Sequence, residues 1–411
     1  IDDNTWEFKI RPDVRFHDGT EFGVGDVVAS FDRAFAFNGS EVRSYLNSIS
    51  SYSAIDDYTF RIKTLDPDPL LLQKVSNVLI VPEEIAYDPE VIDVSVGTAS
   101  YQFDTWEKGD RLYFDRFNDY WGERSVYEEV EMIFRINKIE RVNMLLSGEA
   151  HFLGFVPFDA VDYVLSEGFN VTSIPSLEVQ FLLFNVGSKH FKDVANRKAF
   201  NFAIDRESFT EIVGGYARPV NQFVSNGVFG FSPVVDKNVF DPDLAAEIFV
   251  ETGLEDKTVH FHLPIGLDLL GEHVRTHLAD VGVNVVVSYL EIDKLMDSIE
   301  NRDADIYFFG FKSDNGDASD FFNVVVKTDG EFNAAGYSSS DVDSMIAQAT
   351  TSMNLKNRIE ILHSLMKLVV DRDRIGVPLF EYETLYSFIP ELNYDPRVDG
   401  FIYFDEIKIK Q

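Results

Sequence analysis

The chain opens with a segment in which apolar and polar residues alternate. Residues Thr5 to Arg11 follow a period of two, which is typical of a half-buried strand. The residues His17 to Thr20 favour a turn, because they combine Asp and Gly. Asp26 stands where it could cap a helix that begins at Val27. The opening segment therefore predicts a strand, a turn and a helix in that order.

The middle of the chain alternates between helical and extended patterns. Residues 137–148 predict a helix, because Val142 and Leu145 fall on one face and Gly148 stands at the C-cap position. Further along, helices are predicted at 244–252, 271–281 and 292–301, between strands at 258–263, 283–289 and 306–310. Such alternation favours an α/β lobe with its own sheet. A helix pair at 339–371 and a short strand at 401–407 complete a mixed α/β prediction.

The length of 411 residues exceeds what one hydrophobic core usually serves. At roughly 150 residues per domain, the chain divides into about two or three domains with room for a cleft between them. Hydrophobic residues make up 45% of the sequence and aromatic residues 14%, so that large cores can form. We expect a folded globular protein.

Charge and the lack of cysteine exclude several classes of function. The 36 Lys and Arg residues against 70 Asp and Glu residues give a net charge of −34. Such a field repels phosphate backbones, so nucleic acids are poor partners. Without cysteine the chain can have no disulfide, thiolate metal site or cysteine nucleophile. The acidic residues are spread along the chain, which suits either a salt-adapted surface or an ordinary acidic secreted protein.

Several segments, in order along the chain, carry a resemblance to one family: Trp6–Pro12, Val14–Thr20, Gly97–Tyr101, Lys108–Asp110, Asn118–Gly122, Arg141–Ala150, Phe184–Asn185, Phe191–Val194 and Ala203–Arg206. Together they resemble the large solute-binding proteins of the oligopeptide, dipeptide and nickel ABC importers (family 5). Arg141 to Ala150 is similar to that family's "LLSGEAD" helix, with His151 at the place of the acid.

The resemblance implies a fold and a location. The fold is a mixed α/β, two-lobed fold of the type II periplasmic-binding-protein kind with an additional inserted lobe. Residues 1–96 correspond to the inserted lobe, 97–190 and 385–411 to the first main lobe, and 191–384 to the second main α/β lobe. The family's usual first strands precede residue 1, so we expect an N-terminal segment before this chain. Family members are extracellular or periplasmic, and as a lipoprotein this one would be tethered to the membrane through that segment.

One acidic loop carries the candidate binding site. Gly310 to Phe322 follows a predicted buried strand, and ligand sites in α/β lobes favour such loops. The loop resembles the dipeptide-binder pattern "GW..DNGDPDNF", whose first Asp holds the α-ammonium group of the peptide, and this position is Asp314. The other expected ligand contacts are Phe311, Asn315 and Asp317. The alternative is that Asp314, Asp317 and Asp320 only form turns in a polar loop.

Other chemistry-bearing patterns are weaker. His273 and His277 are spaced as metal ligands on a predicted helix, and His260 and His262 share one face of a strand. No further cluster completes a ligand set, so we expect solvated histidines and no metal. Gly23 to Gly25 lacks the third glycine of a dinucleotide loop, and the sequence has no nucleophile elbow or P-loop. We therefore expect no cofactor and no enzymatic activity.

These observations together predict the binding component of an ABC importer. It would capture a short peptide in a cleft between lobes, close on it by hinge motion, and deliver it as a monomer to a membrane permease. Phe311 stands where the pattern has Trp and Ala318 where it has Pro, so a nickel chelate, an opine or an oligosaccharide stays open as the ligand. Two other classes also stay open: a secreted hydrolase, and a receptor or chaperone without transport.

Overall fold

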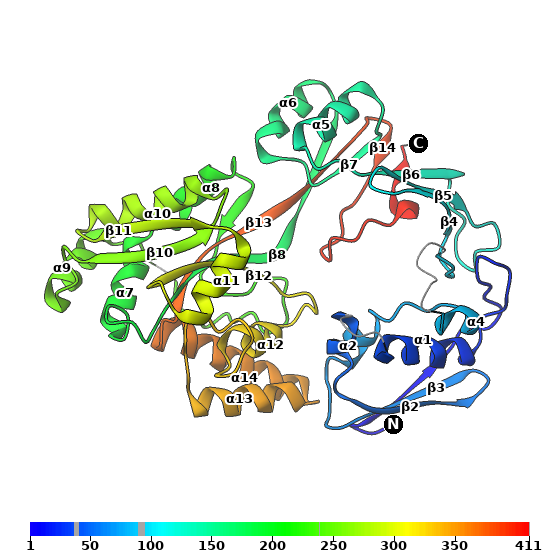
Figure 1. Cartoon of the computed structure of the whole chain (residues 1–411), viewed down its shortest axis with the longest axis horizontal. Coiled ribbons are helices and arrows are strands. Elements are labelled where there is room, and N and C mark those ends of the chain that lie inside the picture. The colour runs from blue at the N-terminus through cyan, green and yellow to red at the C-terminus, as the bar shows by residue number, and fades with distance from the viewer. Residues whose placement is uncertain (37–40, 89–94, 238, 411) are drawn as a thin grey trace.

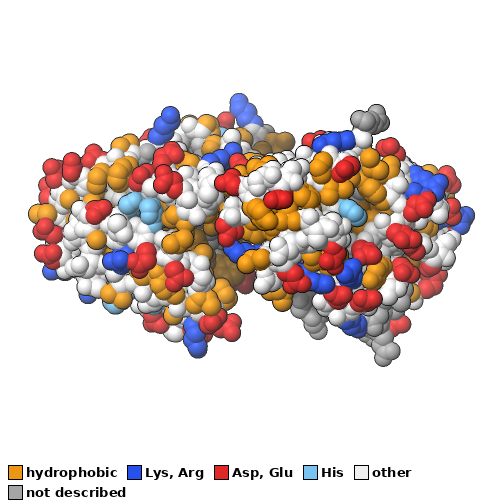
Figure 2. Space-filling model, turned by 90° about the horizontal axis from the view of Figure 1, so that it is seen from above, with side chains coloured by type: hydrophobic (Ala, Val, Ile, Leu, Met, Phe, Trp, Pro, Cys, Tyr) orange, Lys and Arg blue, Asp and Glu red, His pale blue; other side chains and the backbone are white. Residues whose placement is uncertain are grey.

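The computed structural model describes residues 1–36, 41–88, 95–237 and 239–410. Its helices and strands form several groups arranged in an arc; the N-terminal group forms one end of that arc, and the C-terminal segment lies partway along it, beside β6 and β7 (Figure 1). Acidic side chains are spread over the face seen in Figure 2 and do not gather in one patch. Among the described residues, no helix combines the length and the apolar character needed to cross a lipid bilayer.

The N-terminal group is a three-stranded antiparallel sheet covered by helices. Its strands, in the order β1-β3-β2, are β1 (Thr5–Lys9), β3 (Thr59–Thr64) and β2 (Ile49–Asp56), and its helices are α1 (Val24–Ala36), α2 (Glu41–Tyr45), α3 (Leu71–Val75) and α4 (Glu83–Ala86). Phe31, Phe60 and Ile62 form its core. The strand and helix predicted for the opening segment are confirmed.

The role predicted for Asp26 as the cap of this first helix is wrong in detail. Helix α1 begins at Val24, two residues before Asp26. The Asp26 carboxylate accepts hydrogen bonds from the backbone N–H of Gly23 at 2.7 Å and of Glu83 at 2.8 Å. Asp26 therefore joins the start of α1 to the start of α4, because its two oxygens satisfy free N–H groups at both.

A second group contains a three-stranded meander and a helical segment. The meander runs in the order β4 (Tyr101–Glu107), β5 (Arg111–Arg116) and β6 (Glu129–Ile133). Helix α5 (Lys138–Ser147) is confirmed, with Asn137 accepting from two backbone N–H groups at its start and Gly148 in the left-handed conformation at its end. A 3-10 turn, η1 (Phe158–Ala160), and helix α6 (Val161–Ser166) follow.

The largest sheet has seven strands and mixed direction. Its path is β11-β10-β12-β8-β13-β7, and β9 (Ala217–Pro219) also pairs with β13. The bounds are β7 (Phe152–Gly154), β8 (Asn170–Phe184), β10 (Thr258–Pro264), β11 (Asn284–Leu290), β12 (Ile306–Lys312) and β13 (Gly376–Phe388). Strands β10, β11 and β12 are parallel, whereas β8 is antiparallel to both β12 and β13.

Helices cover both faces of this sheet. One core contains Leu182, Phe184 and Phe380 and lies under α7 (Val194–Ala203), α8 (Arg206–Ile212), α9 (Pro242–Thr252) and α10 (Asp268–Asp280). The other contains Phe181 and Phe321 and lies under α11 (Ile292–Asn301), α12 (Ala318–Phe321), α13 (Ser340–Thr351), α14 (Leu355–Lys367) and two π-helical turns, η2 (Phe322–Val326) and η3 (Leu368–Arg372). Neighbouring residues of β8 point to opposite cores, as the pleat of a strand requires. The helix and strand alternation predicted from 244 to 371 is confirmed.

Two long strands connect the large sheet to the group that contains α5 and α6 (Figure 1). Strand β8 has 15 residues and β13 has 13, and they pair along nearly their whole length. Their register shifts twice, between Pro378 and Phe380 and between Glu381 and Glu383. The second shift lies opposite Leu177, which has a positive φ of 60°. Both strands therefore belong to both groups. The predicted division of the chain at 96/97, 190/191 and 384/385 stays a prediction.

The strand predicted at 401–407 is wrong. The end of the chain forms a 3-10 turn, η4 (Phe404–Glu406), and a short pair of strands, β14 (Leu392–Asn393) and β15 (Lys408–Ile409). Phe404 packs edge-on against Tyr101 at 5.6 Å between ring centroids, and its ring is tilted against that of Phe114 at 5.7 Å. The apolar residues of this segment are thus used for packing on the meander and not for strand pairing.

Candidate functional site

A cavity of about 470 Å³ lies at the carboxyl end of β12. Its lining comprises Tyr45, Phe309, Gly310, Phe311, Lys312, Asp314, Asn315, Asp320, Val324, Val325 and Phe332. Tyr45 belongs to α2 of the N-terminal group. All other lining residues lie between Phe309 and Phe332, in β12 and in the segment that follows it. The cavity therefore lies between two groups of the fold.

The loop from β12 to α12 is held in place by backbone contacts. Gly316 has a left-handed φ of 65°, and its N–H donates to the carbonyl of Ser313 at 2.8 Å. The carbonyl of Gly316 accepts from the N–H of Phe229 at 2.8 Å, and the N–H of Ala318 donates back to Phe229 at 2.8 Å. A left-handed position suits glycine because it has no Cβ. These bonds fix the loop against a separate segment of the chain.

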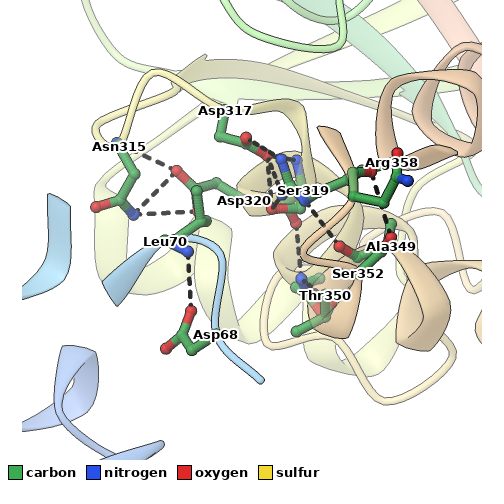
Figure 3. Close-up of polar contacts among 12 residues, drawn as sticks. Asp68, Leu70, Asn315, Asp317, Ser319, Asp320, Ala349, Thr350, Ser352 and Arg358 are labelled. Carbon is green, nitrogen blue, oxygen red and sulfur yellow. Dashed lines mark hydrogen bonds and ion pairs between the residues drawn. The ribbon is translucent and has the colours of Figure 1, made fainter. Parts of the chain in front are cut away.

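Asp317 lies inside this framework and does not line the cavity. Its side chain is 3% exposed, and its two oxygens accept from Nη1 of Arg358 at 2.6 Å and Nη2 at 2.8 Å (Figure 3). The Asp317 carboxylate also accepts from the N–H of Ser319 and so caps α12. Arg358 is 1% exposed, and a buried guanidinium needs such a counter-charge. Its oxygens are engaged within the fold, and Asp317 is not part of the cavity lining, so its predicted contact with a ligand has no support from the geometry.

Asp314 has the opposite surroundings. The structure places it in the lining of the cavity with an exposed side chain. Among the described residues, its carboxylate takes part in no hydrogen bond or ion pair. A free carboxylate at the edge of a cavity can receive a cationic group, since a charge-assisted hydrogen bond offsets the loss of hydration.

Phe311 and Asn315 also line the cavity, and their contact with a ligand stays a prediction. The ring of Phe311 packs edge-on against Phe321 with centroids 5.6 Å apart, which fixes one apolar wall. Asn315 is held by Asp320, because its Nδ2 lies 3.1 Å from both carboxylate oxygens and its backbone N–H donates at 3.2 Å (Figure 3).

Asp320 is a cavity residue that the sequence did not single out as a contact. The pKa of Asp320 is raised to about 6, chiefly by burial. The hydrogen bonds from Asn315 act in the opposite direction, and the nearby charges of Asp317 and Asp314 act in the same direction as burial. One feature of the sequence could have indicated that Asp320 lies at the cavity. It stands three residues after the helix cap Asp317, a spacing that places its side chain on the side of the helix that faces the loop.

Gly310 and Lys312 connect the cavity to other parts of the chain. A Cβ on Gly310 would stand 2.5 Å from Oε1 of Glu178 and 2.7 Å from the amide of Gln180, so this position accepts no larger residue without movement. Lys312 donates from Nζ to the carbonyl of Asp399 at 3.2 Å, which joins β12 to the C-terminal segment. Lys312 is the cationic residue of this lining, beside the carboxylates of Asp314 and Asp320.

The histidines lie away from this cavity. Nε2 of His273 is 2.7 Å and Nε2 of His277 is 3.5 Å from the hydroxyl oxygen of Ser208. Burial lowers the pKa of both histidines, and so favours neutral rings. His262 contacts the hydroxyl of Ser298 at 2.7 Å. Within the described residues, no three His, Asp or Glu side chains are grouped so that they could hold a metal ion.

Comparisons with known proteins agree with one another. The model of the bacterial extracellular solute-binding proteins, family 5 Middle, matches residues 1–333. The glutathione-binding protein GsiB of Pectobacterium atrosepticum is 26% identical over 369 residues, which cover 84% of this chain and 71% of GsiB.

Two solved structures are similar over the whole chain. The ABC transporter substrate-binding protein CtaP of Listeria monocytogenes has a TM-score of 0.92 at 18% identity, covering 100% of this chain and 88% of CtaP. The periplasmic binding protein DppA of Helicobacter pylori, solved in complex with the peptide STSA, has a TM-score of 0.78 at 19% identity, covering 100% and 87%. At these identities the structures show similarity of fold.

Proposed function

The chain belongs to family 5 of the bacterial extracellular solute-binding proteins, the substrate-binding components of ABC importers, and we propose that its solute is a short peptide. Membership confirms the family, the type II fold and the transport role that the sequence predicted. Members of the family act outside the cytoplasm, with a small solute and a membrane permease as partners.

The observation that carries the proposal is the carboxylate of Asp314, which has no partner in the described part of the chain and lines a cavity between two groups of the fold. We infer that this carboxylate receives the α-ammonium group of the peptide. Asp320 adds negative charge to the same lining, and Phe311 offers an apolar wall for a side chain. Two proteins that are similar to this chain, the glutathione-binding protein GsiB and DppA in complex with the peptide STSA, support the same class of ligand.

Binding would be coupled to a change in the angle between the groups. Tyr45 reaches the cavity from the N-terminal group, while Asp314 reaches it from the β12 loop. A ligand that touches both walls stabilises the arrangement in which they are close, so it shifts the population toward a closed form. The paired strands β8 and β13, with their register shift near Leu177, are the proposed hinge.

We also propose an oligomeric state, a membrane attachment and the absence of catalysis for this protein. The protein would act as a monomer, since each ligand is enclosed by one chain. It would be attached to the membrane, as the family resemblance implies. It would also release its ligand unchanged, because its role in the importer is capture and delivery. Size measurement in solution tests the first of these, and incubation with peptide and ester substrates followed by product analysis tests the third.

The ligand class is tested by calorimetric titration of the full chain. The panel contains di- and tripeptides, reduced glutathione, a nickel–histidine chelate and a short oligosaccharide. We expect saturable binding of the peptides, and of glutathione if its side-chain linkage is accepted. Binding of the chelate or the sugar with no binding of any peptide would refute the proposal, and product release from a substrate would place the protein in the hydrolase class.

A further inference from the structure

A second and larger cavity lies on the opposite face of the seven-stranded sheet. Its volume of about 670 Å³ falls within the range of small-molecule sites. Phe380 lines it and belongs to the core under α7 to α10, whereas Phe311 of the first cavity packs on the core under α12 to α14. The two cavities are therefore separate, and a molecule in one does not touch the other.

The walls of this second cavity come from three parts of the chain. Helix α5 contributes Lys138 and Arg141, and β13 contributes Phe380 and Tyr382. The segment after β7 contributes Phe155, Pro157, Phe158 and Asp159. The end of α8 and the start of α10 contribute Ile212, Val213, Gly214, Gly266, Leu267, Asp268, Leu269 and Leu270. A molecule bound here would contact both groups that the hinge strands join.

The lining is mostly aromatic and aliphatic. The ring of Phe158 stacks on Tyr382 at 5.7 Å and on Tyr216 at 6.2 Å. Phe155 is 61% exposed and has a left-handed φ of 56°, and Leu269 on the facing wall is 72% exposed. A left-handed conformation is costly for a residue with a Cβ. Exposed apolar side chains on both walls of one cavity are the surface that an apolar molecule would cover.

Two polar groups of this lining have unused capacity for a ligand. Nη1 of Arg141 donates to the carbonyls of Arg135 at 2.9 Å and Ile136 at 3.0 Å, and among the described residues no carboxylate pairs with its guanidinium. The hydroxyl of Tyr382 makes no hydrogen bond within the described part of the chain. Lys138, in contrast, is paired with Asp159 at 2.8 Å. Since Asp268 lies on the facing wall, an anion is favoured on the α5 side.

We propose that this cavity binds a small carboxylate with an aromatic or aliphatic body. The carboxylate pairs with Arg141, and the body packs between Phe158, Phe155 and Leu269. The hydroxyl of Tyr382 supplies a hydrogen bond, and burial, followed by the charge of Glu178, raises the pKa of Tyr382 to about 12, which keeps this donor protonated. The site does not depend on the identity of the solute in the first cavity.

The test uses 3-phenylpropionate and its neutral amide, 3-phenylpropanamide, titrated into the full chain without peptide. The ionic strength is kept near about 0.15 M, where the net negative charge of the protein is screened beyond about 8 Å. We expect the carboxylate to bind more tightly than the amide. Arg141→Gln should lower the affinity for the carboxylate about tenfold and leave the amide nearly unchanged, because one charge-assisted hydrogen bond is lost.

A second variant separates binding from folding. Leu269→Trp fills the mouth of the cavity from an exposed position, so it should abolish binding of both compounds while the protein stays folded. Leu72→Trp is the matched control, because Leu72 is 50% exposed on α3 outside the lining. The proposal is overturned by absence of saturable binding, by equal affinity for acid and amide, or by binding that Leu269→Trp leaves intact.

Discussion

Two carboxylates in one short loop have opposite roles. Asp317 is buried, holds Arg358 through both oxygens and caps α12. Asp314, three residues earlier, is exposed, lines the cavity and has no partner among the described residues. The residue type is the same, and the difference is made by a partner on a distant helix. A carboxylate whose charge is satisfied inside the fold contributes to stability, and one whose charge is left unsatisfied at a cavity can serve a ligand.

Removing the partner of the buried carboxylate should have the largest effect. Arg358→Met leaves Asp317 without its counter-charge, so the free energy of unfolding should fall by about 3–5 kcal/mol. Chemical denaturation at pH 7 measures this. The double variant Arg358→Met with Asp317→Asn should recover part of the loss, because no buried charge remains. A fall of less than about 1 kcal/mol in the single variant would show that the ion pair does not hold the loop.

A substitution at Gly310, in the wall of the cavity, should lower the free energy of unfolding less than Arg358→Met does. In Gly310→Ala the new Cβ meets Glu178 and Gln180, and the free energy of unfolding should fall by about 1–3 kcal/mol as these side chains move. Gly187→Ala is a matched control, since its Cβ would meet only the side chain of Asn185 at an ordinary 3.5 Å. Equal stability of the two variants would mean that the packing behind Gly310 is loose.

Asp320 should make the stability depend on pH in a direction unusual for an aspartate. Its pKa of about 6 in the folded protein is above the ordinary value of 3.8, so between about pH 4 and pH 6 the folded state binds the proton more tightly than the unfolded state. Its contribution is therefore favourable below pH 4 and is lost as the pH rises through 6. Asp320→Asn should raise the free energy of unfolding at pH 7 by about 1 kcal/mol, a value reduced for partial exposure.

The control for Asp320 is the same variant at pH 4. There the carboxyl is mostly protonated in the folded state, so the substitution should change stability little. Urea denaturation at the two pH values gives the comparison. A variant that loses stability at pH 7 would contradict the assignment, since it would mean that the ionised carboxylate is the favoured form.

Asp314→Asn should have the smallest effect on folding. An exposed side chain without a partner contributes little to stability, so the free energy of unfolding should change by less than about 0.5 kcal/mol. The midpoint of thermal unfolding, compared with that of Asp317→Asn, measures the contrast. A large loss of stability in Asp314→Asn would show that Asp314 is also part of the framework and would remove the difference between the two carboxylates.

The sequence predicted what is local in this loop and missed what is distant. The buried strand before Gly310 and the acidic residues after it placed Asp314 at a strand end, and the structure brings Phe311 and Asn315 to the same cavity. Arg358 lies 41 residues after Asp317, and only tertiary packing brings them together. Since no local pattern marks that pairing, the sequence could not tell which Asp is neutralised.

The same limit explains the errors in the fold. Asp26 bonds to the start of α4, which is distant in sequence, so its role went beyond the local cap that was predicted. The apolar residues after Phe401 resembled a strand, but the segment forms a 3-10 turn, and Phe404 packs on the meander. The second cavity was not foreseen, because its walls come from three separate parts of the chain.

The most direct test of the account is a cycle of two peptides and two proteins. A dipeptide with a free amino terminus and its N-acetylated form are each titrated into the protein and into Asp314→Asn. We predict that the substitution lowers the affinity for the free peptide by about 10- to 100-fold, which corresponds to about 1.5–3 kcal/mol of binding free energy. The affinity for the acetylated peptide should stay nearly unchanged. Equal losses for both peptides, or no loss for either, would contradict the role of Asp314 as the partner of the ammonium group.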